Sequence, residues 1–173
     1  MDLPGQFYVF INYEQAARFG HVGWGVRVGE DEYFFGSTDH LWKHDWWDLA
    51  AWLRYMDVPP DGDIDWWVER GSRSEMLETM RRGHHQRSGY HIRYHAYKAI
   101  EVPRALPERA IEAAHKLRVM GWNLSRHNCV HQTFMILSEY CEQHDFPNPV
   151  NNLTHLIPKR WFQLLPGKTE LLI

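Results

Sequence analysis

The chain has 173 residues, of which 44% are hydrophobic and nine are tryptophan. This length and composition suffice for one well-filled hydrophobic core but not for two, so we expect a single domain over residues 1–173. The formal net charge of −3 excludes the strongly basic surface that is typical of nucleic-acid-binding and membrane-surface proteins. The first residues lack the basic and apolar regions of a signal peptide, and no apolar run reaches membrane-span length, so we expect a cytoplasmic protein.

Strand patterns dominate the beginning of the chain. Residues 6–13 are rich in aromatic and β-branched side chains, which favour strands. Residues 21–28 alternate in polarity, and residues 31–37 follow them after a turn at Gly29 and Glu30. These last two segments therefore predict a β-hairpin.

The middle of the chain mixes element types. Residues 44–55 are dense in tryptophan and predict a loop or a short helix packed on the sheet, and residues 64–70 predict a short strand. Ser72 and Glu75 have the spacing of a capping box, so a helix is expected to begin there and to end at Gly83.

Helical patterns follow one last strand pattern. The longest strand pattern covers residues 90–102. Three helices are then expected, over residues 107–120, 129–141 and 154–165, the last with Pro158 as the point where it can break. Strands that come early and helices that come late predict an α+β domain.

The two cysteines both lie in the predicted helix 129–141. At about 1.5 Å of rise per residue their Cα atoms lie roughly 18 Å apart, whereas a disulfide needs them within about 7 Å. Cys129 and Cys141 are therefore expected to be free thiols. Val130, Phe134, Leu137 and Cys141 form one apolar stripe, so Cys141 is expected to be buried.

Cys129 occupies a position suited to chemistry. Asn128 precedes the helix and is among the best N-cap residues, which places Cys129 in the first turn. The unpaired N–H groups and the helix dipole favour a thiolate there and can stabilise an oxyanion. The alternative stays open that Cys129 is simply a small buried apolar side chain.

His21 is the histidine best placed to act with a thiolate. His21, Gly23 and Gly25 share one face of the strand 21–28. Glycines inside a strand often mark the close approach of another backbone, so we expect the helix that begins at Cys129 to lie against this face. The alternative is that His21 caps the start of the strand or faces solvent.

Two motifs, GHVGWGV at residues 20–26 and NCVHQTFMILSEY at residues 128–140, resemble the circularly permuted branch of the NlpC-type, papain-like thiol hydrolases, which includes relatives of lecithin:retinol acyltransferase. The resemblance implies a papain-like domain over residues 1–173, with an antiparallel sheet packed against the helix that carries the cysteine. It makes Cys129 the nucleophile and His21 the base, and it makes Asn128 and His131 the flanking cap and oxyanion positions.

The family usually places a third polar residue, often histidine, on the strand after the base. Here that strand reads YFFGS at residues 33–37 and has no histidine. Ser37, Thr38 or Asp39 is therefore expected to orient His21, and Asp39 has the best chemistry for holding the required tautomer.

The resemblance and the residues together predict a peptidase or amidase type of thiol hydrolase, without a cofactor. Its substrate is expected to be a peptide or an acyl-containing small molecule with an amide, ester or thioester bond. Two alternatives stay open: acyl transfer, which the lack of a membrane anchor disfavours, and a noncatalytic binding domain on the same scaffold. The oligomeric state is not indicated.

A metal site is a further alternative that the spacing disfavours. His127, Cys129 and His131 cluster along the chain, and more histidines are available at positions 84, 85, 91 and 95, the last two on one predicted strand face. Structural zinc sites usually show two closely spaced ligand pairs, and this chain shows only half of such a pattern. We therefore expect no metal, and we expect the tryptophan pairs at 46–47 and 66–67 to pack in the core.

Overall fold

A six-stranded antiparallel sheet forms the centre of the protein, in the order β10-β8-β1-β2-β3-β5. The computed structural model describes residues 4–40, 57–58, 64–85, 91–142, 144–151 and 153–173. The strands are β1 (Gly5–Asn12), β2 (His21–Arg27), β3 (Tyr33–His40), β5 (Ile64–Gly71), β8 (Ala96–Val102) and β10 (Thr169–Leu171). The predicted hairpin is β2–β3, and the predicted α+β class is confirmed.

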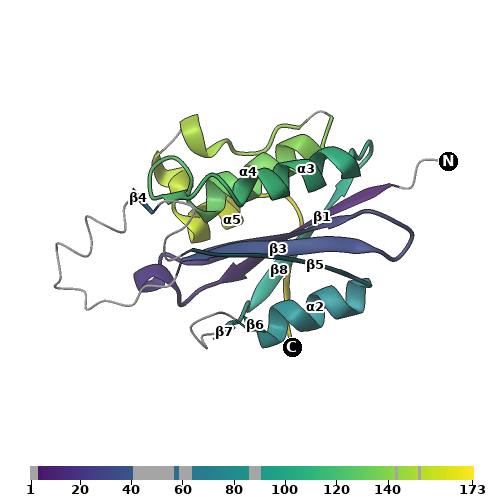
Figure 1. The fold of residues 1–173 in the computed structure, drawn as a ribbon, viewed down its shortest axis with the longest axis horizontal. Coiled ribbons are helices and arrows are strands. Elements are labelled where there is room, and N and C mark those ends of the chain that lie inside the picture. Colours follow the sequence, from purple (N-terminus) through teal and green to yellow (C-terminus); the bar gives the residue numbers. More distant parts are fainter. Residues whose placement is uncertain (1–3, 41–56, 59–63, 86–90, 143, 152) are drawn as a thin grey trace.

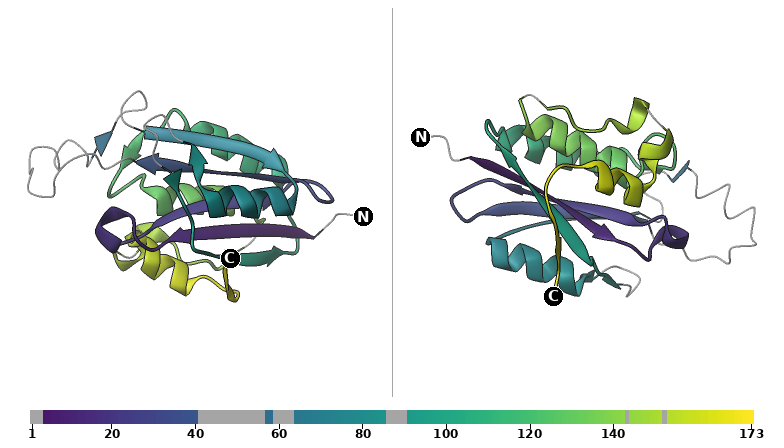
Figure 2. Two further views of the ribbon diagram at one scale, coloured as in Figure 1. Left: turned by 90° about the horizontal axis from the view of Figure 1, so that it is seen from below. Right: turned by 180° about the vertical axis from the view of Figure 1, so that it is seen from behind.

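Helices cover both faces of this sheet (Figure 1). Helices α3 (Pro107–Leu117), α4 (Cys129–Tyr140) and α5 (Pro158–Leu164) lie on one face, and α2 (Arg73–Arg82) lies on the other. Figure 2 shows the sheet and its two helical layers from below and from behind. We call the side of the sheet covered by α3, α4 and α5 the α4 face, and the side covered by α2 the α2 face. Each described helix is too short or too polar to cross a membrane.

Burial on both faces explains why β1 is apolar at almost every position. Phe7, Val9 and Ile11 belong to the core cluster under α3, α4 and α5. Tyr8 and Phe10 point the other way, into the cluster under α2. A central strand covered on both sides has no solvent-facing row, so its sequence shows no polar alternation.

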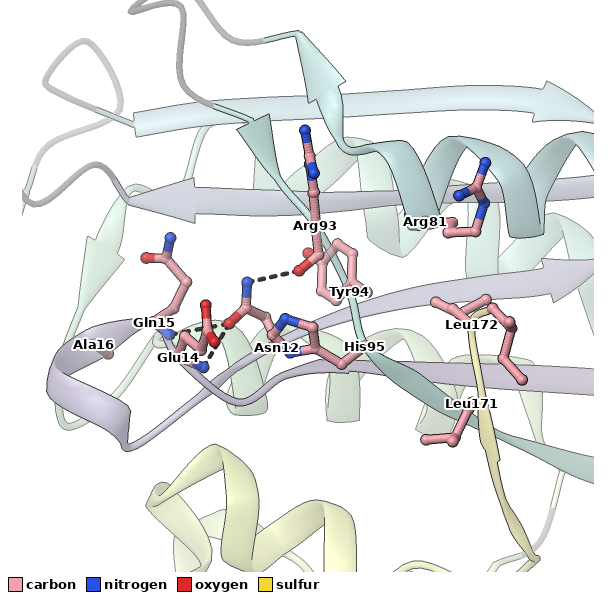
Figure 3. Close-up of a pocket in the computed structure, with 11 residues that line it drawn as sticks. Asn12, Glu14, Gln15, Ala16, Arg81, Arg93, Tyr94, His95, Leu171 and Leu172 are labelled. Carbon is pink, nitrogen blue, oxygen red and sulfur yellow. Dashed lines mark hydrogen bonds between the residues drawn. The ribbon is translucent and has the colours of Figure 1, made fainter.

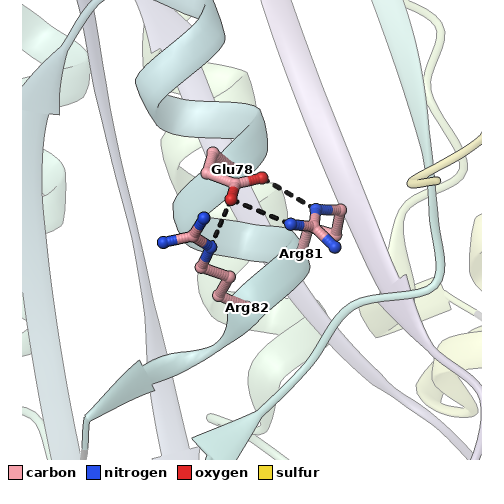
Figure 4. A network of polar contacts seen from close by, with 3 residues as sticks. All are labelled: Glu78, Arg81 and Arg82. Carbon is pink, nitrogen blue, oxygen red and sulfur yellow. Dashed lines mark hydrogen bonds and ion pairs between the residues drawn. The ribbon is translucent and has the colours of Figure 1, made fainter.

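Helix α2 begins as its sequence predicts. The Ser72 hydroxyl accepts a hydrogen bond from the Glu75 N–H, and the Glu75 carboxylate accepts one from the Ser72 N–H at 2.7 Å. On the outer side of the helix, Glu78 pairs with Arg81 at 2.7 Å and with Arg82 (Figure 4). These pairs are solvent-exposed, so they stabilise the fold only slightly.

The predicted strand 90–102 is wrong as a single element. The structure has β7 (His91–Ile92), which pairs with β6 (His84–His85), and then β8. Between them the Tyr94 N–H donates to the Met80 carbonyl and the His95 N–H donates to the Ile11 carbonyl. Tyr94 is thus bonded to α2 and the next residue, His95, to β1 on the other side, so β7 and β8 cannot form one straight strand.

The C-terminal part also differs from the expectation. Pro158 begins α5 and separates it from a 3₁₀ helix at Leu153–Leu156, so the predicted helix 154–165 is two elements. Proline is favoured in the first turn, where its missing N–H costs nothing. Strand β10 and the short pair β4 (Asp57–Val58) with β9 (Trp122–Asn123) were not predicted, because two or three residues carry no periodic pattern.

The tryptophan pair in β5 packs as expected, on opposite faces of the sheet. The half-buried Trp66 lies on the α4 face, where its Nε1–H donates to the Ala114 carbonyl at 3.0 Å. Trp67 is buried on the α2 face and stacks on the His84 ring at 4.3 Å between centroids. The predicted element at 44–55, with Trp46 and Trp47, lies outside the described residues.

Tyr140 ties helix α4 to the two central strands. Its side chain is fully buried, its hydroxyl donates to the Arg27 carbonyl at 2.7 Å, and the same hydroxyl accepts from the Gln6 N–H at 3.1 Å. Burial raises the pKa of the Tyr140 phenol, so it stays protonated and able to donate.

Replacing Tyr140 with Phe should lower the free energy of unfolding by about 1–3 kcal/mol, because it leaves the part-buried N–H of Gln6 and the part-buried carbonyl of Arg27 without their partner. Urea unfolding measures the loss. Tyr13→Phe is the control, since Tyr13 is half-buried and its hydroxyl bonds to no described residue. Equal losses in the two variants would show that the Tyr140 hydroxyl does not hold α4 on the sheet.

Candidate functional site

Asn128 fixes the start of helix α4, as predicted. Its side-chain oxygen accepts from the N–H groups of Val130 at 3.0 Å and His131 at 3.2 Å. Its side-chain nitrogen donates to the carbonyls of Leu124 and Leu156, each at 3.1 Å. Because the whole amide is engaged in these bonds, Asn128 acts as a cap and has no N–H left to donate to an oxyanion.

The cap also decides which donor remains at the helix start. The N–H groups of Val130 and His131 are bonded to Asn128, and the Gln132 N–H donates to the Asn128 carbonyl at 3.1 Å. Within the described part of the chain, the Cys129 N–H has no hydrogen-bond acceptor. Cys129 therefore carries both the thiol and the one free backbone donor of the first turn.

His131 is part of this cap and is not a base. Its Nδ1 lies 2.9 Å from the Asn128 side-chain oxygen, which can only accept, so Nδ1 carries the proton. Burial, and to a lesser degree the neighbouring His127, lower the pKa of His131 to about 4. The ring is therefore neutral at pH 7.

A cavity of about 480 Å³ brings the two principal predicted residues to one place. Cys129, which is 7% exposed, and His21, which is 8% exposed, both border it. The rest of the wall comes from the segment before β2, the segment before α4 and the start of α5, and it consists of Gln15, Ala16, Phe19, Gly20, Trp122, Leu124, Ser125, Asn128, Leu156, Ile157 and Pro158. The wall is largely apolar.

His21 is oriented by one of the three residues proposed for that role. Its Nε2 lies 3.0 Å from the Ser37 hydroxyl, and both side chains are buried. The Thr38 hydroxyl has no hydrogen-bond partner among the described residues. The backbone of Asp39 lies in β3, and its side chain lies outside the described part of the structure.

The expected packing of α4 against the glycine face of β2 is wrong. Helix α4 packs on the opposite face, which presents Val22, Trp24 and Val26. A Cβ on Gly23 would lie 2.7 Å from the Tyr94 hydroxyl, and one on Gly25 would collide with Met76 of α2. The two glycines therefore admit side chains on the α2 face and not the backbone of α4.

This correction changes how the two candidate residues meet. Strand alternation puts the His21 ring on the α2 face, where it binds Ser37, while Cys129 approaches from the α4 face. His21 is the first residue of β2, and the cavity lies at this end of the strand. The two residues therefore border the cavity from opposite faces of the sheet.

Asn12, which sequence reasoning missed, holds the segment that forms one wall of the cavity. Figure 3 shows Asn12 and its hydrogen bonds from a second, open pocket that the same segment also borders. The Asn12 side-chain oxygen accepts from the N–H groups of Glu14 at 2.7 Å and Gln15 at 3.0 Å, and its nitrogen donates to the Arg93 carbonyl at 2.7 Å. The following 3₁₀ turn, Ala16–Arg18, separates this cavity from an open pocket of about 760 Å³ on its other side. An asparagine at the end of a strand was the available signal.

The structure also places the candidate metal ligands. His84 pairs with Glu69 at 3.1 Å, and His95 accepts from the Tyr13 N–H at 3.0 Å. Across the described residues, no three His, Cys, Asp or Glu side chains come close enough to hold a metal ion. Cys129 and Cys141 are both free thiols, as predicted.

No protein-family model, curated protein or solved structure matches this chain. Functional inference therefore starts from the chemistry of the cavity itself.

His131 should make the stability of the protein fall in acid. In the unfolded chain the His131 ring binds a proton at the ordinary pKa of 6.5, whereas in the native protein its pKa is about 4. As the pH falls from 6.5 to 4, the unfolded state therefore binds a proton that the native state does not, and the free energy of unfolding should fall by about 3 kcal/mol. His131→Gln should lose less stability over this range in urea unfolding at a series of pH values. His115→Gln, at an exposed position, is the control, and identical pH dependence in His131→Gln and the wild type would contradict the assignment.

Proposed function

We propose that this protein is a thiol hydrolase that cleaves an amide, ester or thioester bond, with Cys129 as nucleophile and His21 as base. The observation that carries the proposal is the shared cavity: a cysteine with a free N–H at the start of a capped helix and a buried, oriented histidine border the same space of about 480 Å³.

The reaction follows from these groups. The Cys129 thiol gives its proton to Nδ1 of His21, and its sulfur attacks the carbonyl carbon of the substrate. The negative charge moves to the carbonyl oxygen, which accepts a hydrogen bond from the Cys129 N–H. When the oxyanion collapses, the leaving group takes the proton from His21, and an acyl group stays on the sulfur. Water, with His21 again as base, then releases the acid and restores the thiol.

The orientation of the histidine supports this assignment of its nitrogens. Nε2 lies 3.0 Å from the Ser37 hydroxyl, and we assign the exchange of a proton with the thiol to Nδ1. When Nε2 donates to Ser37, Nδ1 is the unprotonated position and can act as base. Ser37 thus has the orienting role that the third residue plays in thiol and serine hydrolases.

The other cysteine makes a useful contrast. Cys141 follows the last residue of α4, is 4% exposed, and has its pKa raised to about 12 by burial. Its N–H is bonded to the Leu137 carbonyl, so Cys141 has no free donor for an oxyanion, although it borders an open pocket together with His144. Cys141 therefore acts as a packed apolar side chain and should be inert towards electrophiles.

The wall of the cavity indicates the kind of substrate. Phe19, Leu124 and Ile157 border the cavity and are also among the exposed large apolar residues, so they form an apolar mouth open to solvent. Such a mouth binds an apolar group next to the scissile carbonyl. The same feature keeps acyl transfer as a second candidate, in which an alcohol or amine replaces water as the acceptor.

The resemblance to the permuted NlpC-type hydrolases agrees with this chemistry. The base begins a strand, the nucleophile follows an asparagine and begins a helix, and the base precedes the nucleophile in the chain. We therefore include a papain-like origin of the fold in the proposal. The observed α+β sheet and helices are compatible with it.

Iodoacetamide should alkylate Cys129 of the native protein at pH 7 faster than a denatured control, because the native site provides a base. His21→Ala should slow the reaction at least tenfold by removing that base. Mass spectrometry of the labelled peptide identifies the site.

His115→Ala is the matched control, since His115 contacts Phe34 and Trp66 and does not border the cavity. Cys129→Ala should abolish the fast labelling and leave Cys141 unmodified. Native labelling no faster than in the denatured control would refute the hydrolase and leave a noncatalytic binding domain as the function.

The apolar mouth should make catalysis depend on acyl chain length. On p-nitrophenyl esters, kcat/KM should rise up to about fourfold for each methylene added from acetate to hexanoate. Leu124→Ser should flatten this rise. Leu164→Ser is the control, because Leu164 is equally exposed, at 45% against 42%, and lies outside the cavity. A flat series in the wild type would mean that the mouth does not bind the acyl group.

A further inference from the structure

Three arginines line a second pocket, outside the cavity that holds Cys129. Arg81, Arg82 and Arg93, together with Gly83, line an open space of about 500 Å³, which we call the arginine pocket. Arg81 and Arg82 belong to the last turn of α2, and Arg93 lies between β7 and β8. No acidic side chain of the described residues lines this pocket. The fold therefore concentrates positive charge here, in a chain whose net charge is −3.

Glu78 compensates only part of this charge. It binds Arg81 through Nε at 2.7 Å and Nη2 at 2.8 Å, and it binds Arg82 through Nε (Figure 4). The Arg93 guanidinium bonds to no described residue, and only the Arg93 carbonyl is engaged, by Asn12. The C-terminal end of α2 adds a partial negative charge. Three guanidinium groups therefore face one carboxylate and about half a further negative charge, which leaves a net charge of about +1.5.

Two more carboxylates lie near the pocket without neutralising it. Glu69 is paired with His84, the residue after Gly83, at 3.1 Å. Glu14 borders the adjoining pocket of about 760 Å³, which Arg81 and Arg93 also line (Figure 3). No ion pair joins Glu14 to either of these two arginines. The positive charge of the arginine pocket is thus available to a ligand.

The arginines also keep most of their hydrogen-bond donors. A guanidinium group has five N–H donors in a fixed planar arrangement. Glu78 engages two of them on Arg81 and one on Arg82, and within the described residues Arg93 keeps all of its own. Arginine favours phosphate and carboxylate ligands because its fork matches two oxygens at once. The ion pairs with Glu78 also hold two of the three side chains in place before a ligand binds.

We propose that the arginine pocket is a binding site for the phosphate group of a phosphate monoester. Such a group carries a charge of about −1.5 to −2 at pH 7, which matches the charge of the pocket, and it offers three acceptor oxygens to the three side chains. A carboxylate carries one negative charge on two oxygens, so it matches the pocket less well. This binding site is independent of the proposed thiol hydrolase, and either can fail without the other.

An NMR titration of the ¹⁵N-labelled protein with phenyl phosphate and with glycerol phosphate, at constant ionic strength, tests the site. Both compounds should bind and shift the arginine Nε–H signals, because they share the phosphate group. Acetate should bind at least tenfold more weakly. Arg93→Gln should raise the dissociation constant of both phosphates about tenfold, the effect of one charge-assisted hydrogen bond.

The charge of the ligand gives a second measurement. A phosphate monoester loses one negative charge below its second pKa of about 6, whereas sulfate keeps both charges. Between pH 7.5 and pH 5, the binding of phenyl phosphate should therefore weaken about fivefold relative to that of sulfate. Sulfate corrects for the titration of protein groups near the pocket, such as His84 and Glu14, because these act on both ligands.

Arg104→Gln is the matched control. Arg104 is exposed and pairs with Glu142 at 3.1 Å, as Arg81 pairs with Glu78, but it does not line the pocket. This variant should keep the wild-type dissociation constants, and Arg93→Lys should fall between Arg93→Gln and the wild type, since it restores the charge without the fork. Equal binding by the wild type and Arg93→Gln, an equal loss in Arg104→Gln, or acetate bound as tightly as phosphate would overturn the proposal.

Discussion

The side-chain amide of Asn128 is the constraint on which the candidate site depends. It closes the first turn of α4 and at the same time binds the carbonyls of Leu124 and Leu156, so the helix start and two wall segments of the cavity share one anchor. Because it uses the N–H groups of Val130 and His131, it leaves the Cys129 N–H as the free donor. One polar side chain thus determines both where the thiol lies and which group can face an oxyanion.

The sheet divides the remaining parts of the site between its two faces. The apolar side chains of β2 hold α4, while His21, Ser37 and Tyr94 form a polar row on the α2 face. Buried polar groups are stable only when they are bonded to one another, and the row meets that requirement at His21, where β2 begins beside the cavity. The site is therefore a junction between an apolar layer that carries Cys129 and a polar layer that carries His21.

Several features could be predicted from the sequence because they depend on neighbouring residues. The Ser72–Glu75 capping box, the Asn128 cap and the β2–β3 hairpin each involve residues a few positions apart, and each is confirmed. The choice of Cys129 over Cys141 also came from local position, at the start and at the end of one helix. Ser37 was among the residues proposed to orient His21, because it follows His21 on the adjacent strand.

The sequence by itself determined the types of most of the longer elements, the α+β class and the start of α4, since propensity, periodicity and capping act within one or two turns. Only the tertiary structure decided which face of β2 meets α4, because both faces are buried and the alternation of side chains does not say which layer covers each. It also decided that the predicted strand 90–102 is interrupted at Tyr94 and that Gly23 admits the Tyr94 ring. Both follow from contacts between residues far apart along the chain: Tyr94 is 14 positions from Met80 and 71 from Gly23, and His95 is 84 positions from Ile11.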